Sequence, residues 1–241
     1  MNEKSCSKNY GEIYQVSTMS ALLDGVYDGV LTYNQIKQHG DFGIGTFDHL
    51  DGELLAFDGK FYRLRGGSAI PLTEKDSTPF CTVTYFNPQT KYNIDQPMGK
   101  ESFETLLKDL VPSENLYYAF RIEGTFKKIS TRTVSYQEHY VPMTQAVAEQ
   151  QSIEFENTKG TIVGFWTPPY AQGIAVAGYH FHFIDANQQK GGHVFDYVID
   201  SAAVFIDQKS HMNLYTPTTK AFLNARLSRK NLIKEINLTE G

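Results

Sequence analysis

The chain of 241 residues has little cysteine, one tryptophan and no long apolar run. Its two cysteines, Cys6 and Cys81, belong to no Cys-x-x-Cys pair, so we expect free thiols rather than a disulfide or a cysteine-based zinc site. No run approaches the roughly 20 apolar residues that a membrane-spanning helix needs. The first residues are polar and lack the apolar core of a secretory signal, which favours a cytoplasmic protein.

Basic residues are also in short supply. Lys and Arg number 22 against 27 Asp and Glu, which gives a formal net charge of −5. A general nucleic-acid binder needs a basic surface, so this balance argues against that class. Phe and Tyr are plentiful, at 16 and 15 residues. Because aromatic side chains suit a pleated, half-buried surface, their number favours sheet over helix.

The apolar patterns predict an α+β fold with antiparallel-rich sheet in both halves. Residues 1–11 are expected to form a disordered tail, and the polar run 149–157 indicates a boundary near residue 150. Two Asp-Gly pairs, at 51–52 and 58–59, separate apolar runs and predict a meander of three strands. Further strands are expected over 80–86, 116–122, 125–134, 160–166, 174–184, 193–198 and 202–206. Helices are expected between a cap at 17–18 and Gly25, and over 32–39, 101–110, 143–148, 220–227 and 231–236.

Three histidines are expected to converge on one face of a hairpin. His180 and His182 are two residues apart on a predicted strand, so their side chains point to the same face, with phenylalanines on the other. His193 opens the returning strand, and reflection about the intervening polar loop puts it opposite His182 or its neighbour. Three imidazoles with an open fourth position are typical of a catalytic zinc site, although imidazole also suits iron, copper and nickel.

The other candidates carry weaker signals of their own. A Lewis-acid metal needs a nearby acid or base and a cation for an anionic substrate. Taken alone, Glu53 beside a turn, Arg132 on a strand and Glu240 near the end of the chain are typical of solvent-facing residues. Four further histidines are also expected at the surface: His39, His49, His139 and His211. A polar strand face without a metal is therefore the alternative interpretation.

Five long segments carry a resemblance that covers nearly the whole chain, from about Ile13 to Gly241. They are YQVSTMSALLDGVYDG, GDFGIGTFDHLDGELLAFDGKFYRL, FKKISTRTV, KGTIVGFWTPPYAQGIAVAGYHFHFID and GGHVFDYV. In these segments the chain resembles the bacterial α-acetolactate decarboxylase family. The resemblance implies an N-terminal α/β mixed-sheet part over 12–150 and a small open β-barrel over 151–241 that carries the metal site and ends in helices and a tail. It also implies a homodimer.

The resemblance also implies an activity and a set of site residues. The implied reaction is zinc-dependent decarboxylation of (S)-2-acetolactate to (R)-acetoin and CO2, in acetoin and butanediol biosynthesis. Zinc would act as the electron sink for an enediolate, which is then protonated stereospecifically. The implied zinc ligands are His180, His182 and His193. The other implied site residues are Arg132, Glu53 and Glu240, with Glu235 as the fallback for Glu240, and the pocket residue Thr46.

Other functions would use similar residues. A zinc hydratase of the carbonic anhydrase type also uses His-x-His followed by a distant histidine, and a cupin-like oxygenase would hold iron instead. A β-rich binding or oligomerisation module with an incidental histidine face is the alternative outside enzymes. Release of CO2 from acetolactate, hydration of CO2 and metal analysis separate these classes.

Overall fold

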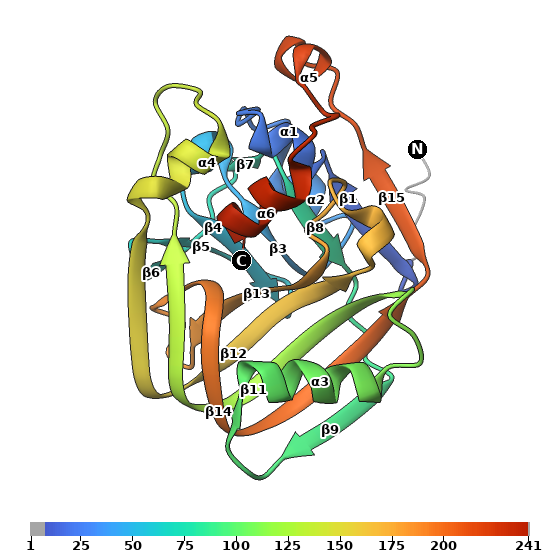
Figure 1. Ribbon diagram of the computed structural model, residues 1–241, viewed down its shortest axis with the longest axis vertical. Helices are drawn as coiled ribbons and strands as arrows, with labels where there is room; N and C mark the ends of the chain where they lie inside the picture. Colours follow the sequence, from blue (N-terminus) through green and yellow to red (C-terminus); the bar gives the residue numbers. More distant parts are fainter. Residues whose placement is uncertain (1–7, 241) are drawn as a thin grey trace, which may run out of the picture.

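Two large β-sheets, a small two-stranded sheet and a group of helices make up the described part of the chain (Figure 1). The structure, a computed structural model, describes residues 8–240 except for the side chains of Glu149 and Gln151. Most of the predicted tail over residues 1–11 falls outside this range, as does Cys6. Cys81 is a buried free thiol, as predicted. Across the described residues, no helix is both long enough and apolar enough to cross a membrane.

The first sheet has the strand order β15-β1-β8-β3-β4-β5-β6. Its strands are β1 (Glu12–Val16), β3 (Phe42–Thr46), β4 (Glu53–Phe57), β5 (Lys60–Arg65), β6 (Ser68–Pro71), β8 (Cys81–Thr84) and β15 (His211–Tyr215). A small separate sheet pairs β2 (Leu31–Thr32) with β7 (Ser77–Thr78). Strands β3, β4 and β5 form the predicted meander.

The turn between β4 and β5 consists of Asp58 and Gly59, whose φ angles are 51° and 72°. Positive φ at both central residues defines the type I′ turn, whose twist matches that of a hairpin. This predicted tight turn is therefore confirmed.

The second tight turn, predicted at Asp51-Gly52, is wrong. Thr46 pairs with Glu53, so a longer connection over residues 47–52 joins β3 to β4 and contains the 3-10 turn η1 (Asp48–Leu50). Leu50 is fully buried in a core cluster beneath the helices, and the longer connection is what lets it reach that cluster. The connection ends where β4 begins, at Glu53.

The second sheet contains the longest strands of the chain. Its strands are β9 (Thr90–Ile94), β10 (Met98–Gly99), β11 (Tyr117–Thr133), β12 (Gln151–Thr167), β13 (Gly178–Asp185) and β14 (Gly191–Lys209). The predicted break at Glu123-Gly124 and the division between 193–198 and 202–206 are wrong, because β11 and β14 run through both places. A side chain on Gly124 would meet the carbonyl oxygen of Ser201 at 2.2 Å, so this glycine permits close strand approach rather than a break.

Both predicted parts of the chain contribute to the second sheet. Strands β9, β10 and β11 precede residue 150, whereas β12, β13 and β14 follow it. β11 pairs with β12 from Tyr118–Trp166 to Thr133–Gln151. β13 pairs with β12 along one edge and with the start of β14 along the other. Residues from both sides of the predicted boundary near 150 therefore lie side by side in one ring of strands.

Helix α3 (Lys100–Leu110) lies across one face of this sheet, as Figure 1 shows, and agrees with the helix predicted at 101–110. Its Phe103 and Leu107 are fully buried in an aromatic-rich core with Phe181 and Phe183 of β13. The two phenylalanines thus pack behind the strand face that carries the histidines. Aromatic side chains of the sheet, among them Phe120, Phe126 and Tyr197, make up much of this core.

The remaining helices gather near the opposite end of the molecule (Figure 1). They are α1 (Met19–Leu23), α2 (Tyr33–Ile36), α4 (Met143–Ala146), α5 (Lys220–Asn224) and α6 (Leu232–Glu240), with 3-10 turns η2 (Val147–Glu149) and η3 (Pro169–Ala171). Thr18 caps α1 by accepting a hydrogen bond from Ala21 N, as predicted. Helix α6 packs against α1 and α4 and continues to Glu240, beyond the predicted end at Ile236. Its last turn therefore reaches the sheet.

A buried ion pair ties the end of β14 to neighbouring segments. Lys209 and Asp207 have fully buried side chains, and Lys209 Nζ lies 2.7 Å from Asp207 Oδ2. The ammonium group also donates to the carbonyl oxygens of Tyr10 and Tyr85. Asp207 in turn accepts a hydrogen bond from the amide of Asn87, at 2.6 Å.

We expect Lys209→Met to lower the free energy of unfolding by about 3–5 kcal/mol, because it leaves the Asp207 carboxylate buried without its cation. Urea denaturation followed by circular dichroism measures the loss. Lys60→Met is the matched control, because Lys60 is exposed beside the Asp58-Gly59 turn. Equal stability of the two variants would show that the buried pair contributes nothing.

Candidate metal centre

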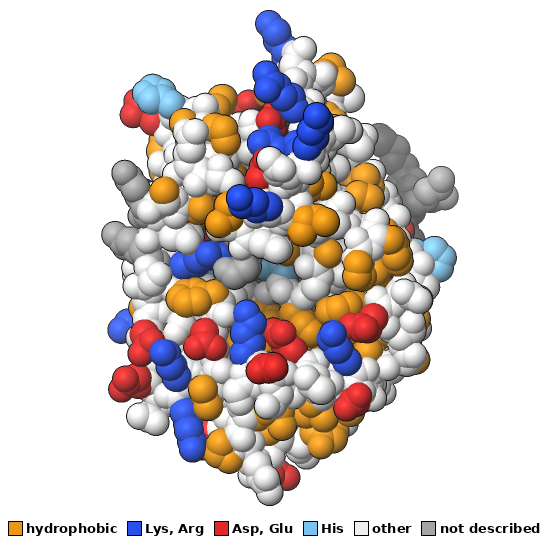
Figure 2. Space-filling model, viewed as in Figure 1, with side chains coloured by type: hydrophobic (Ala, Val, Ile, Leu, Met, Phe, Trp, Pro, Cys, Tyr) orange, Lys and Arg blue, Asp and Glu red, His pale blue; other side chains and the backbone are white. Residues whose placement is uncertain are grey.

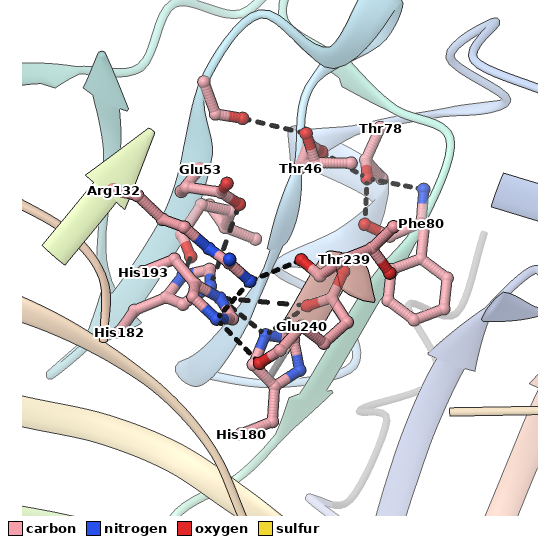
Figure 3. A network of polar contacts seen from close by, with 12 residues as sticks. Thr46, Glu53, Thr78, Phe80, Arg132, His180, His182, His193, Thr239 and Glu240 are labelled. Carbon is pink, nitrogen blue, oxygen red and sulfur yellow. Dashed lines mark hydrogen bonds and ion pairs between the residues drawn. The ribbon is translucent and has the colours of Figure 1, made fainter. Parts of the chain in front are cut away.

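The three predicted histidines meet where β13 and β14 pair (Figure 3). His182 lies directly opposite His193, and His180 lies two residues earlier on the same face. The ring centroids are 5.0, 5.2 and 5.3 Å apart, and His180 Nε2 is 3.2 Å from His193 Nδ1. The convergence expected from hairpin geometry is present.

The chemical state of the histidines suits a metal. His182 Nδ1 lies 2.6 Å from the carbonyl oxygen of Leu54, which can only accept, so Nδ1 carries the proton and Nε2 keeps its lone pair. His182 Nε2 is buried and has no hydrogen-bond partner in the described part of the chain. Burial lowers the pKa of His182 to about 4 and those of His180 and His193 well below the ordinary value. Three neutral imidazoles, with one nitrogen each within 4.8 Å of the others, fit a transition-metal ion.

Two carboxyl groups face the histidines from different elements. Glu53 Oε2, from the start of β4, lies 3.7 Å from His182 Nε2. Glu240 Oε2, from the last turn of α6, lies 3.4 Å from His180 Nε2 and 3.8 Å from His193 Nδ1. Burial raises the pKa of Glu53 to about 8, with a further contribution from Glu240, and burial raises the pKa of Glu240 to about 7. Both groups are therefore suited to exchange protons near neutral pH.

Arg132 supplies a positive charge beside the same group. It lies on β11 directly opposite His193, and only 7% of it is exposed. Its Nη2 donates to the carbonyl oxygen of Thr239 and lies 3.4 Å from His193 Nε2. The last turn of α6 therefore holds the guanidinium group in place (Figure 3).

The pocket at this centre includes one further predicted residue and several unpredicted ones. Thr46 is buried in its wall, and its hydroxyl group donates to the carbonyl oxygen of Gly52 at 2.8 Å. The unpredicted lining residues are Leu22, Gly45, Leu50, Phe80, Val134, Met143, Gln150 and Thr239. They come from elements scattered along the chain, and no spacing in the sequence marks them as a group.

The remaining acidic and histidine candidates lie elsewhere. Glu235, the fallback for the tail carboxylate, pairs with Arg229 at 2.6 Å. A second group of ligand-type side chains, Asp28, Asp48 and His49, is partly exposed. His39 stacks on Tyr14, and His139 and His211 are exposed. Of the two groups of ligand-type side chains found among the described residues, the three histidines are therefore the more deeply buried group.

A hollow opens toward the centre between α3 and α6. Figure 2 shows this hollow in the middle of one face, with a histidine visible at its base. Its lining includes Lys100 and Glu104 of α3 and Asn237 and Glu240 of α6. Glu240 lines both the hollow and the pocket at the histidines, so the two share this side chain.

Comparisons with known proteins point to one family. A family model described as Alpha-acetolactate decarboxylase matches residues 13–229, so α6 and Glu240 lie beyond the matched range. The alpha-acetolactate decarboxylase of Bacillus subtilis strain 168 is 55% identical over 232 residues, covering 95% of this chain and 91% of that protein. That of Bacillus licheniformis is 53% identical over 236 residues, covering 97% and 93%. A crystal structure of the Bacillus subtilis enzyme matches with a TM-score of 0.94 and 54% identity, covering 95% of this chain and 99% of that chain.

We expect His193→Ala to weaken transition-metal binding by more than about 100-fold, because loss of a ligand exceeds the 10- to 100-fold cost of losing an outer-shell partner. Titration calorimetry with Zn²⁺ and with Co²⁺ on chelator-treated protein measures the affinity, and elemental analysis measures the stoichiometry. His139→Ala, at an exposed histidine, should bind like the unaltered protein. A His193→Ala protein that keeps the full affinity would remove this residue from the ligand set.

Proposed function

The chain belongs to the alpha-acetolactate decarboxylase family, and on this premise we propose that it converts (S)-2-acetolactate to (R)-acetoin and CO2. The observation that carries the proposal is a buried centre in which three neutral imidazoles face two carboxyl groups and a guanidinium group. The metal in this proposal is zinc, held by His180, His182 and His193. A cytoplasmic location and a homodimer belong to the same proposal.

The substrate explains why such a pocket is needed. Acetolactate carries a ketone next to the carbon that bears the carboxylate, so loss of CO2 leaves an electron pair that the ketone oxygen must accept. Zinc bound at the histidines would supply the Lewis acid that stabilises this negative charge. The ketone already provides the electron sink that thiamine or pyridoxal would otherwise bring, so no organic cofactor is required.

Arg132 binds and orients the anionic substrate in this proposal. A guanidinium group pairs with a carboxylate or with a developing oxyanion through paired N–H donors. Its hydrogen bond to Thr239 O holds it against the histidines before the substrate arrives, so little reorganisation accompanies the reaction. Apolar neighbours such as Leu22, Phe80 and Val134 keep the pocket low in water, which strengthens this charge interaction.

One proton must be returned to the enediolate after CO2 leaves. In this proposal Glu53 or Glu240 carries that proton, and the support is that both carboxyl groups approach the histidines, from the first sheet and from α6 respectively. Burial raises the pKa of both groups in the metal-free centre, which favours a protonated carboxyl group that can carry the proton. Delivery from one fixed side would give a single enantiomer of acetoin.

The proposal predicts that chelation of the metal abolishes CO2 release from acetolactate and that added Zn²⁺ restores it. Manometric or coupled detection of CO2, with chiral chromatography of acetoin, measures both the rate and the product. An assay of CO2 hydration tests the alternative that the protein is a zinc hydratase. Measurement of the iron content tests the alternative that it is an iron oxygenase. Full decarboxylation by metal-free protein would contradict the zinc-dependent mechanism, and no decarboxylation by zinc-loaded protein would contradict the proposed reaction.

We expect Glu240→Gln to lower kcat by about 100-fold or more while zinc stays bound, because a positioned acid or base contributes about 10²–10⁴-fold. Glu235→Gln is the matched control on the same helix, since Glu235 pairs with Arg229 instead of facing the histidines. Steady-state kinetics and elemental analysis on both variants provide the comparison. Equal rates for the two variants would place Glu240 outside the reaction.

A further inference from the structure

The side chain of Gln150 lines the metal pocket together with Arg132, Glu53 and Glu240. Its Oε1 atom is buried and lacks a hydrogen-bond partner within residues 8–240, the side chains of Glu149 and Gln151 apart. A buried acceptor without a donor is destabilising, and native proteins satisfy nearly all such atoms. A ligand that brings a donor into the pocket would remove this cost.

The backbone directs Gln150 toward the site. Thr133 pairs with Gln151 at the end of the β11–β12 ladder, so Gln150 comes next to Val134 in the antiparallel register. Val134 also lines the pocket, and it follows directly after the end of β11, two residues beyond Arg132. Gln150 and Arg132 therefore reach the same pocket from the ends of the paired strands β12 and β11.

Most other polar groups of the pocket already have partners. Thr46 donates to Gly52 O, and the Thr239 hydroxyl donates to the carbonyl oxygens of its own helix. Arg132 is a donor only and serves anionic oxygens. Both carboxyl groups face the histidines. Apart from the imidazole nitrogens that would hold a metal, the amide oxygen of Gln150 is thus the buried acceptor at this site that makes no hydrogen bond with the described residues.

We propose that Gln150 accepts a hydrogen bond from the tertiary hydroxyl group of the substrate and so selects 2-hydroxy-3-oxo acids over 3-oxo acids without the hydroxyl. This inference rests on the proposed function. The acetolactate anion has a single hydrogen-bond donor, its hydroxyl group, and among the described residues that line the pocket Gln150 Oε1 is the buried side-chain acceptor without a hydrogen-bond partner. A site built to hydrogen-bond a substrate hydroxyl rejects analogues that lack it, because its own buried group is then left unpaired.

The experiment compares two inert ligands, 2-hydroxy-2-methylbutanoate and 2-methylbutanoate, on zinc-loaded protein. Neither has a ketone, so neither is decarboxylated, and they differ only in the hydroxyl group. We expect the unaltered protein to bind the hydroxy acid more tightly, and Gln150→Met to reduce this affinity ratio by about 3- to 10-fold, the worth of one hydrogen bond. Titration calorimetry gives both dissociation constants, and kcat/KM for acetolactate should fall in parallel.

Gln145→Met is the matched control, because Gln145 is exposed on α4 and should leave the ratio unchanged. Gln150→Asn, which shortens the side chain by one methylene group, provides a second variant should Gln150→Met fail to fold or lose zinc, and it should also lower the ratio. An unchanged ratio in a folded, zinc-loaded Gln150 variant would overturn the inference, and so would equal binding of the two acids by the unaltered protein. These affinity ratios are measured without turnover, so they do not depend on decarboxylation. A failure of the proposed reaction is detected separately, by the assay of CO2 release.

Discussion

The antiparallel register of three neighbouring strands is the constraint on which the site depends. His182 of β13 lies opposite His193 of β14, and His193 lies opposite Arg132 of β11. Directly paired residues share a face of the sheet, so a cation and two imidazoles stand in one row. A slip of one residue in either pairing would turn these side chains to the phenylalanine-lined face and destroy the group.

Burial of this row has opposite effects on its two kinds of titratable group. It favours neutral imidazoles, whose lone pairs are then free for a metal, and it favours protonated carboxyl groups at Glu53 and Glu240. Both effects arise from the same low-dielectric surroundings. The last turn of α6 completes these surroundings, because Thr239 accepts a hydrogen bond from Arg132 while Glu240 faces the histidines.

The parts of the site that were predictable from sequence are those determined by local geometry. The pairing of His182 with His193 follows from strand periodicity and a short loop, and the turn at Asp58-Gly59 follows from residue type. The Asp51-Gly52 turn was mispredicted because the burial of Leu50 in a distant core lengthens the connection. Gln150 and Thr239 carry no pattern at all, since only the packing of β12 and α6 brings them to the pocket.

The docking of the two sheets explains why the centre needs the whole fold. The carbonyl oxygen of Leu54 in β4 sets the tautomer of His182, and Glu53, its neighbour on β4, faces the same imidazole ring. The side chains of these two residues point to opposite faces of β4. Both residues nevertheless contact His182, because Leu54 does so through its backbone carbonyl group and Glu53 through its side chain. A single strand of the first sheet therefore both orients the His182 imidazole and supplies a carboxyl group. Without the first sheet, the three histidines would lack both the hydrogen bond that fixes the tautomer of His182 and the carboxyl group of Glu53. The chemistry of the centre therefore depends on the interface between the two sheets.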